Sequence, residues 1–293
     1  MPVQRWSQSG RYADEMPSRR DFLFSLAAGS AAVLTGHVAG NVYHAGVSRH
    51  RLSLPQLQKP VRVAQLSDLH YGPYIHEGSV RAWVRQTQAE SPDLIVITGD
   101  VVDKDLKRPL EPLVAALSGL GAPLGVWACL GNHDNARFRF GALRELAAAL
   151  AEAGVTLLVD KGHLVRNDLY LAGVDDLEVG RPDLEAALRG APGDAATLLL
   201  CHQPDFYPRM RVHVDLTLSG HTHGGQVQLP GLGALYTSSR YGERYLEGWA
   251  PPPDANFGKG YVSRGLGVSL LPLRFNCPAE LAVFDVTPGE RLL

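Results

Sequence analysis

The fold is decided by the stretch Asp93-Leu94-Ile95-Val96-Ile97-Thr98-Gly99-Asp100, an apolar run that ends in glycine and aspartate. A strand covered on one face alternates apolar and polar residues, whereas a strand covered on both faces is apolar throughout. The run therefore predicts a strand over 93–98 with other elements packed on both of its faces. Asp100 follows directly after that strand.

Stretches with strand and helix patterns alternate on both sides of this run. Short apolar stretches typical of strands lie at 61–66, 124–130, 155–159, 164–166, 169–174, 196–201 and 214–218. Stretches with helical spacing or composition lie at 78–90, 110–120, 140–153 and 182–188. This alternation predicts an α/β fold, and the later strands without helices between them predict a second sheet packed on the first. We therefore expect a four-layer α/β/β/α sandwich, with two mixed sheets flanked by helices.

The composition is that of an ordinary globular protein. The chain has 293 residues, 45% of them hydrophobic and 20% charged, which is enough for one large domain with a full core. The net charge of −2 gives no electrostatic case for nucleic acid, and we expect no such partner. Cys129, Cys201 and Cys277 are too few and too scattered for a disulfide framework.

The N-terminal segment differs in kind from the rest. After a polar start, Ser18-Arg19-Arg20-Asp21-Phe22-Leu23 leads into an apolar stretch, rich in glycine, alanine and serine, that ends near Gly40. This order is typical of a twin-arginine export signal, although a chance arginine pair before a stray helix would look the same. No clean Ala-x-Ala site follows, and the stretch has about the minimum length of a bilayer span, so an uncleaved anchor is as plausible as a released protein.

These features divide the chain into a signal or N-terminal anchor at 1–40, a linker at 41–60 and one large domain at 61–293. They predict an exported protein that is recognised by the twin-arginine export machinery. We expect it in the periplasm or on the outer face of the cytoplasmic membrane, with membrane association if the anchor is retained.

Five polar segments carry the chemistry, and nearly every one follows a predicted strand. They are Asp68-Leu69-His70, Gly99-Asp100-Val101-Val102-Asp103, Gly131-Asn132-His133-Asp134, His202 and Gly220-His221-Thr222-His223. Ligands gather where the strands of α/β sheets end, so these segments should share one rim. Their imidazole and carboxylate groups suit Mn, Fe, Zn or Co. An aspartate after a strand can bridge two such ions, and the segments therefore predict a site for two divalent metal ions.

The order DxH, GDxxD, GNHD, H and GHxH resembles the calcineurin-like metallophosphoesterase family over roughly residues 61–286. This resemblance implies an enzyme, a dinuclear metal-dependent phosphohydrolase that acts through a metal-bridging hydroxide. The segments at 220–226, 264–267 and 276–281 resemble one bacterial branch of the family, the YaeI- and YkuE-like phosphodiesterases, which often carry twin-arginine leaders.

The resemblance also implies a role for each residue of the array. It implies that seven residues bind metal ions of Mn, Zn or Fe: Asp68, His70 and His223 hold one ion, Asn132, His202 and His221 hold the other, and Asp100 bridges them. His133 would be catalytic and would face the phosphate without binding metal. Asp134 would orient His133, and Asp103 would fix a nearby turn or a histidine ring.

The substrate is less well defined than the reaction. The branch implies a phosphodiester, and a related branch cleaves the pyrophosphate of UDP-2,3-diacylglucosamine, so the substrate is either a small molecule or a lipid phosphoester. Side chains expected near the leaving group lie on loops: Tyr71, Arg137, Arg139, Arg240, Tyr241 and Arg264. The stretch 227–260 should frame the site, and its apolar residues either meet a lipid or pack the loop down. A non-catalytic metal-bound envelope scaffold is the alternative of another class.

Overall fold

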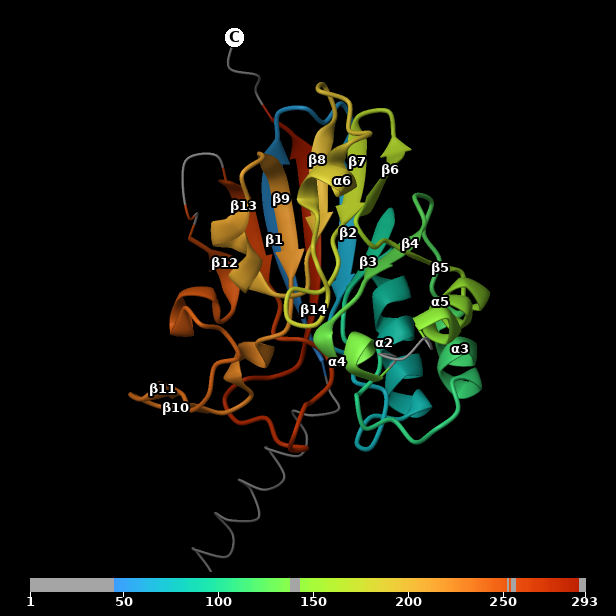
Figure 1. The fold of residues 1–293 in the computed structure, drawn as a ribbon, viewed down its shortest axis with the longest axis vertical. Coiled ribbons are helices and arrows are strands. Elements are labelled where there is room, and N and C mark those ends of the chain that lie inside the picture. Colours follow the sequence, from blue (N-terminus) through green and yellow to red (C-terminus); the bar gives the residue numbers. More distant parts are fainter. Residues whose placement is uncertain (1–44, 138–142, 252, 254–256, 290–293) are drawn as a thin grey trace, which may run out of the picture. The chain divides into compact units, whose positions relative to one another are not determined.

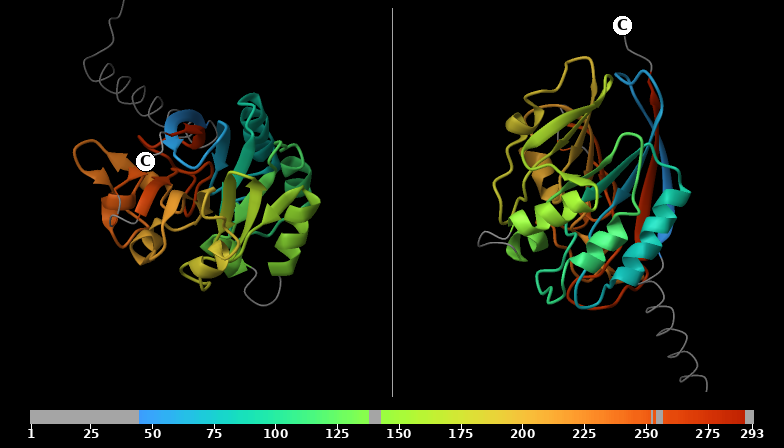
Figure 2. Two further views of the ribbon diagram at one scale, coloured as in Figure 1. Left: turned by 90° about the horizontal axis from the view of Figure 1, so that it is seen from above. Right: turned by 90° about the vertical axis from the view of Figure 1, so that its right-hand side faces the viewer.

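The computed structural model describes residues 45–137, 143–251, 253 and 257–289. They form two six-stranded sheets that pack face to face, with helices on the outer faces of both (Figure 1). Figure 2 shows the same layers from two further sides. The predicted α/β/β/α sandwich of two mixed sheets is confirmed.

The first sheet has the strand order β1-β14-β2-β3-β4-β5. Its strands are β1 (Gly46–Leu54), β14 (Glu280–Pro288), β2 (Val61–Leu66), β3 (Leu94–Thr98), β4 (Val126–Cys129) and β5 (Val155–Leu157). Strands β2 to β5 run parallel, and β14 is antiparallel to β2. In β3, Leu94 and Val96 pack between the sheets, while Ile95 and Ile97 pack under the helices. Burial on both faces explains the unbroken apolar run.

Helices cover the outer face of the first sheet. They are α2 (Glu77–Ala89), α3 (Glu111–Leu117) and α5 (Leu143–Glu152). Trp83 of α2 and Leu146 of α5 are buried in the same core cluster as Ile97, so these helices share one hydrophobic core with the outer face of the sheet. The short helix α4 (Asn132–Arg137) follows closely after β4 and carries part of the array.

The second sheet has the order β12-β13-β9-β8-β7-β6. Its strands are β12 (Gly248–Ala250), β13 (Phe257–Val262), β9 (Val214–Ser219), β8 (Ala196–Leu200), β7 (Leu169–Gly173) and β6 (Lys161–Arg166). The remaining elements are α6 (Leu184–Leu188), the 3-10 helices η1 (Pro204–Arg209), η2 (His223–Gly225) and η3 (Gly242–Tyr245), and the two-stranded hairpin β10 (Gln228–Leu229) and β11 (Gly233–Ala234). Residues of α6, η1 and η3 pack on the outer face of this sheet.

The prediction of a linker at 41–60 is wrong for the central part of this segment. Gly46–Leu54 form β1, which pairs with β14 as the edge strand of the first sheet. The sequence did not reveal this strand because an edge strand needs backbone pairing more than an apolar pattern, and four of its residues are polar or charged in a row. The predicted signal at 1–40 lies outside the described residues. Across the residues that the structure describes, no helix has the length and apolar character of a membrane span.

Candidate metal centre

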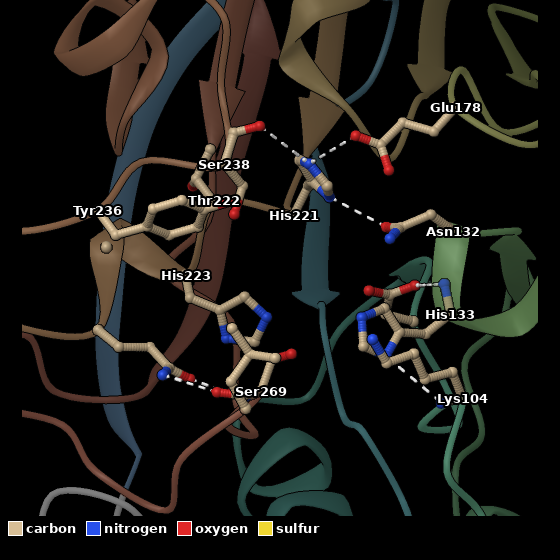
Figure 3. A pocket seen from close by; sticks show the side chains of 14 residues that line it. Lys104, Asn132, His133, Glu178, His221, Thr222, His223, Tyr236, Ser238 and Ser269 are labelled. Atoms are coloured by element: carbon tan, nitrogen blue, oxygen red, sulfur yellow. Dashed lines mark hydrogen bonds and ion pairs between the residues drawn. The ribbon is translucent and has the colours of Figure 1, made fainter. Parts of the chain in front are cut away.

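The five polar segments meet at one edge of the two sheets. Asp68 follows β2, Asp100 follows β3 and Asn132 follows β4, all in the first sheet. His202 follows β8 and His221 follows β9, in the second sheet. Because these five strands are parallel within each sheet, their carboxyl ends bring side chains that lie far apart in the sequence into one pocket, as Figure 3 shows for several of them.

One cluster forms around His223. Its Nε2 lies 3.0 Å from Nε2 of His70 and 3.4 Å from Oδ1 of Asp68. All three side chains are buried, and Nδ1 of His223 has no hydrogen-bond partner. Each of these three side chains can offer a lone pair towards the same buried space. Lone pairs that face one another repel, whereas a metal ion between them would bind all three.

A second cluster forms around the amide oxygen of Asn132. This Oδ1 lies 3.2 Å from Nε2 of His202 and 3.1 Å from Nδ1 of His221. Oδ2 of Asp100 stands between the two clusters, 3.3 Å from Nε2 of His202 and 3.4 Å from Nε2 of His70. The donor atoms of both clusters therefore suit divalent metal ions, and Asp100 is placed to contact both.

Hydrogen bonds to backbone carbonyls fix two of the rings. Nδ1 of His202 donates to the carbonyl oxygen of Thr98 at 2.7 Å, which leaves Nε2 to face the cluster. Nε2 of His221 donates to the carbonyl oxygen of Ser238 at 3.2 Å, which leaves Nδ1 to face the cluster. Such bonds select the tautomer that can bind metal. Thr98 and Ser238 were not singled out from the sequence, since a backbone carbonyl gives no residue signal.

Burial and neighbouring charges together set the pKa values of three histidines at the centre. It lowers the pKa of His221 to about 3, with a further contribution from His202. Burial and the neighbouring ring of His70 also hold the pKa of His223 well below its ordinary value. His202 behaves differently, because Asp100 and Asp68 outweigh burial and hold its pKa well above its ordinary value. Two of the three rings are thus neutral at pH 7, the form in which imidazole binds metal.

The backbone at the centre is strained. Five of the seven predicted ligands have φ in the left-handed region: Asp68 at 53°, His70 at 50°, Asp100 at 50°, His221 at 72° and His223 at 54°. Residues other than glycine seldom adopt such angles, and clusters of them occur at functional sites, where surrounding structure enforces them. The sequence analysis did not predict this backbone strain.

His133 and its neighbours are arranged differently from our expectation. Nδ1 of His133 lies 3.5 Å from Oδ2 of Asp103, which also lies 3.3 Å from Nδ1 of His70. Burial opposes the charged form of His133, but the carboxylates of Asp103 and Asp100 raise its pKa. Asp134, which we expected to orient His133, uses its two carboxylate oxygens to accept hydrogen bonds from the backbone N–H groups of Val102 and Gly131, each at 3.0 Å. Asp134 ties two loops together, because its place in the first turn of α4 points it at backbone donors.

Two segments near the C-terminus, 264–267 and 276–281, support the first cluster. The N–H of Gly267 donates to the carbonyl of Asp68 at 2.7 Å, and a Cβ at Gly267 would lie 2.3 Å from the carbonyl oxygen of Leu69. Only glycine fits so close an approach. The thiol of Cys277 donates to the carbonyl of His223 at 3.2 Å. The resemblance at 264–267 and 276–281 thus has a physical basis in the support of two ligands.

Arg274 is the centre of this support, and we did not predict it. Its guanidinium is fully buried and, within the described part of the chain, pairs with no carboxylate. It donates instead to backbone carbonyls, among them those of Gly267 at 2.6 Å and Cys277 at 3.2 Å. A buried guanidinium with all its donors engaged can hold a loop in one conformation.

A pocket of about 240 Å³ opens over the clusters (Figure 3). Besides ligands and His133, it is lined by Lys104, Glu178, Tyr236, Ser238 and Leu270, among others. Lys104 and Glu178 were not anticipated, although Lys104 directly follows the second motif. Glu178 reaches towards His221, with Oε1 3.8 Å from Nε2.

The side chains expected near a leaving group lie mostly elsewhere. Tyr71 is buried, and Arg264 pairs with Glu247 and Glu280. Arg240 lines a neighbouring hollow of about 150 Å³ that shares Glu178, His221 and Ser238 with the main pocket. Neither Arg139 nor the side chain of Arg137 falls within the described part of the chain.

Comparison with known proteins agrees with this geometry. A model of the family "Calcineurin-like phosphoesterase" matches residues 61–225. The uncharacterized metallophosphoesterase YkuE of Bacillus subtilis is 34% identical over 232 residues, which cover 77% of this chain and 78% of YkuE. Phosphodiesterase YaeI of Escherichia coli is 30% identical over 287 residues, covering 92% of this chain and 100% of YaeI. An uncharacterized metallophosphoesterase of Aquifex aeolicus is 31% identical over 268 residues, covering 87% of this chain and 97% of that protein. The chain therefore belongs to the calcineurin-like phosphoesterase family.

Proposed function

We propose that this metal-dependent phosphohydrolase is a phosphodiesterase that uses two divalent metal ions. The observation that carries the proposal is the position of Asp100, whose Oδ2 stands 3.4 Å from His70 and 3.3 Å from His202. One carboxylate oxygen between two clusters of donors is the arrangement that a pair of ions needs.

The ligands divide as the clusters do. Asp68, His70 and His223 would hold one ion, Asn132, His202 and His221 the other, and Asp100 both. Bound there, the ions would supply a water of lowered pKa and positive charge next to the phosphoryl oxygens. Manganese, zinc and iron all suit this mixture of imidazole, carboxylate and amide donors.

The residues around the clusters do the rest. His133 would hold a proton next to the phosphoryl group and donate it to a phosphoryl oxygen or to the leaving oxygen. Asp103 keeps the His133 ring in position, since Oδ2 lies 3.5 Å from its Nδ1. The ammonium of Lys104 lines the same pocket and would add a positive charge for the ester.

Two observations support a diester. The relative YaeI is named a phosphodiesterase. The pocket is also lined by the charged side chains of Lys104 and Glu178 and by an apolar wall that includes Tyr236, and Figure 3 shows these on opposite sides of the clusters, so that an ester with a substituent on each side would find contacts for both. The apolar wall favours a second candidate, a lipid pyrophosphate of the UDP-2,3-diacylglucosamine type.

The test is hydrolysis by protein that has been stripped of metal and then loaded with Mn, Zn, Fe or Mg in turn. The substrates are bis(p-nitrophenyl) phosphate, p-nitrophenyl phosphate and a lipid pyrophosphate. We expect faster turnover of the diester than of the monoester, and none in the stripped protein. Turnover of the lipid pyrophosphate alone would favour the second candidate. No release from any ester, with two ions bound per chain, would instead indicate a metal-bound scaffold.

We further propose that the chain is exported by the twin-arginine machinery and acts in the periplasm or on the outer face of the cytoplasmic membrane. The proposal is supported by the arginine pair and the apolar stretch before Gly40. A reporter fused to residues 1–60 should lose export when Arg19 and Arg20 are both replaced by lysine. Unchanged export of that variant would exclude this route.

A further inference from the structure

Large hydrophobic side chains are exposed on the two loops that contribute Tyr236 and Leu270 to the pocket. Five of them form what we call the apolar rim: Leu232, Leu235, Tyr236, Leu270 and Leu271. Their exposed fractions lie between 59% and 77%, and they are half of the ten large hydrophobic side chains that are exposed among the described residues. Single exposed leucines are common, but five large exposed hydrophobic side chains on two loops beside the metal centre point to an interaction surface.

The rim is built by two loops that are bonded to each other. The side chain of Gln226 accepts from the N–H of Ser269 at 2.7 Å and donates to its carbonyl at 2.9 Å. The N–H of Phe275 donates to the carbonyl of Gln226 at 2.8 Å. Leu270 also has a left-handed φ of 64°, an unusual conformation for a bulky residue. These hydrogen bonds join the two loops that carry the apolar rim.

The rim is continuous with the metal centre. Tyr236 and Leu270 line the same pocket as His133 and His223, and Figure 3 shows the ring of Tyr236 beside the clusters. On the other side of this pocket lies Lys104, and its loop 103–109 also exposes Asp105, Lys107 and Arg108. An apolar rim on one side of the pocket and a loop with three cations and one anion on the other match the boundary between acyl chains and anionic headgroups.

The chain enters the domain at the same edge. The N–H of Gly46 donates to the carbonyl of Ala279 at 2.8 Å, so β1 starts beside the start of β14. Because β14 is antiparallel to β2, this is the edge at which β2 ends and Asp68 lies. Forty-four residues precede the described part, and the apolar stretch that leads to Gly40 is among them. A chain held at a membrane by that stretch would reach its domain at the edge that carries the pocket.

We infer that the apolar rim docks on a phospholipid bilayer and presents the metal centre to phosphoesters at the level of the headgroups. The inference rests on the proposed function only for the reaction that follows docking. Docking itself depends on the rim, which contains no metal ligand and neither His133 nor Asp103.

The buried state of all three cysteines makes a direct test possible. A cysteine in place of Leu232 or Leu235 in the full chain can be labelled selectively with an environment-sensitive fluorophore. Vesicles of phosphatidylethanolamine and phosphatidylglycerol should shift the emission of both labels to the blue. The matched control is Leu164→Cys on β6, a leucine that is also exposed but lies outside the rim, and its emission should not change. Vesicle binding without a shift at 232 and 235 would overturn the inference, since the N-terminal segment alone would then explain the binding.

Two further measurements separate the alternatives. Leu232→Ser combined with Leu235→Ser should weaken vesicle binding roughly tenfold or more, while hydrolysis of soluble bis(p-nitrophenyl) phosphate stays unchanged. A blue shift that rises with protein concentration in the absence of vesicles would show that a second copy of the chain covers the rim, and would also overturn the inference. Because vesicle binding is measured without turnover, failure of the proposed function leaves this result readable.

Discussion

Nδ1 of His133 and Oδ2 of Asp103 lie 3.5 Å apart, and we propose that this carboxylate positions the histidine. Asp103 also contacts His70, so it connects the proposed catalytic residue to the first cluster. We expect Asp103→Asn to reduce activity or metal affinity about 10- to 100-fold, because a positioning carboxylate contributes in that range. Steady-state kinetics at saturating metal measures the first effect, and calorimetric titration measures the second. Unchanged values for both would contradict this role.

His133 and Asp100 should separate catalysis from metal binding. We expect His133→Ala to keep its metal content and lose about 10²- to 10⁴-fold in kcat, the usual range for a proton donor. Asp100→Ala should lose both together, because its oxygen faces both clusters. Elemental analysis of the purified variants gives the metal content. Full activity in His133→Ala would exclude the proposed role of this residue.

Metal affinity should increase with pH. His202 donates through Nδ1 to Thr98, and the carboxylates of Asp100 and Asp68 hold its pKa well above the ordinary value, which favours a proton on Nε2. A metal ion must displace that proton, and affinity should rise by about tenfold for each pH unit below the raised pKa. Calorimetry in buffers with different ionisation enthalpies counts the protons released. An affinity that stays constant between about pH 6 and pH 8 would show that no proton is displaced.

Arg274→Met should lower the free energy of unfolding by about 3 kcal/mol or more. The substitution leaves several buried carbonyl oxygens without a donor, each at a cost of about 1–3 kcal/mol. Urea denaturation of metal-free protein measures the change. Arg264→Met is a suitable control, because that arginine is partly exposed and its ion pairs with Glu247 and Glu280 are 3.5–3.7 Å long. A similar loss of unfolding free energy in both variants would mean that the buried hydrogen bonds of Arg274 add no more stability than the partly exposed ion pairs of Arg264.

Asp168 provides a test of stability against pH away from the centre. Burial opposes its charge, but Arg166 and the N–H groups of Gln58 and Lys59 lower its pKa. A lowered pKa in the folded state stabilises the protein above the ordinary carboxyl pKa, and this stabilisation is lost as pH falls through the folded value. We expect Asp168→Asn to cost about 1.5–3 kcal/mol at pH 7, the range for hydrogen bonds to a charged group, and much less in strong acid. An equal cost at both pH values would exclude an electrostatic origin.

The sequence predicts the frame of this protein better than its details. The apolar run of β3 and the alternation of strands and helices predict the layers, because burial on both faces leaves a direct pattern. The position of Asp68, Asp100 and His221 after strands predicts that they meet, because parallel strands end at one edge. The edge strand β1 was missed, since its pairing with β14 depends on backbone groups that every residue has.

Finer features depend on geometry that residue types do not encode. Asp103 and Asp134 are both aspartates near His133, and only the backbone decides which one faces the ring. The burial of Arg274 depends on the loop between β13 and β14, whose backbone carbonyls accept from its guanidinium and give no residue signal. The same holds for Lys104, a basic side chain of the pocket that its residue type alone did not distinguish from other lysines of the chain.

The left-handed backbone of the ligands has a consequence for inheritance. Glycine at Asp68, His70 or Asp100 would relieve a conformation that costs roughly 1–2 kcal/mol in other residues, so each such change removes a donor and eases the fold at once. A descendant released from the need to cleave esters would therefore find mutations that favour both its stability and the decay of its centre. The hydrolytic activity of this family member therefore depends on ligands whose backbone conformation lowers the stability of the fold.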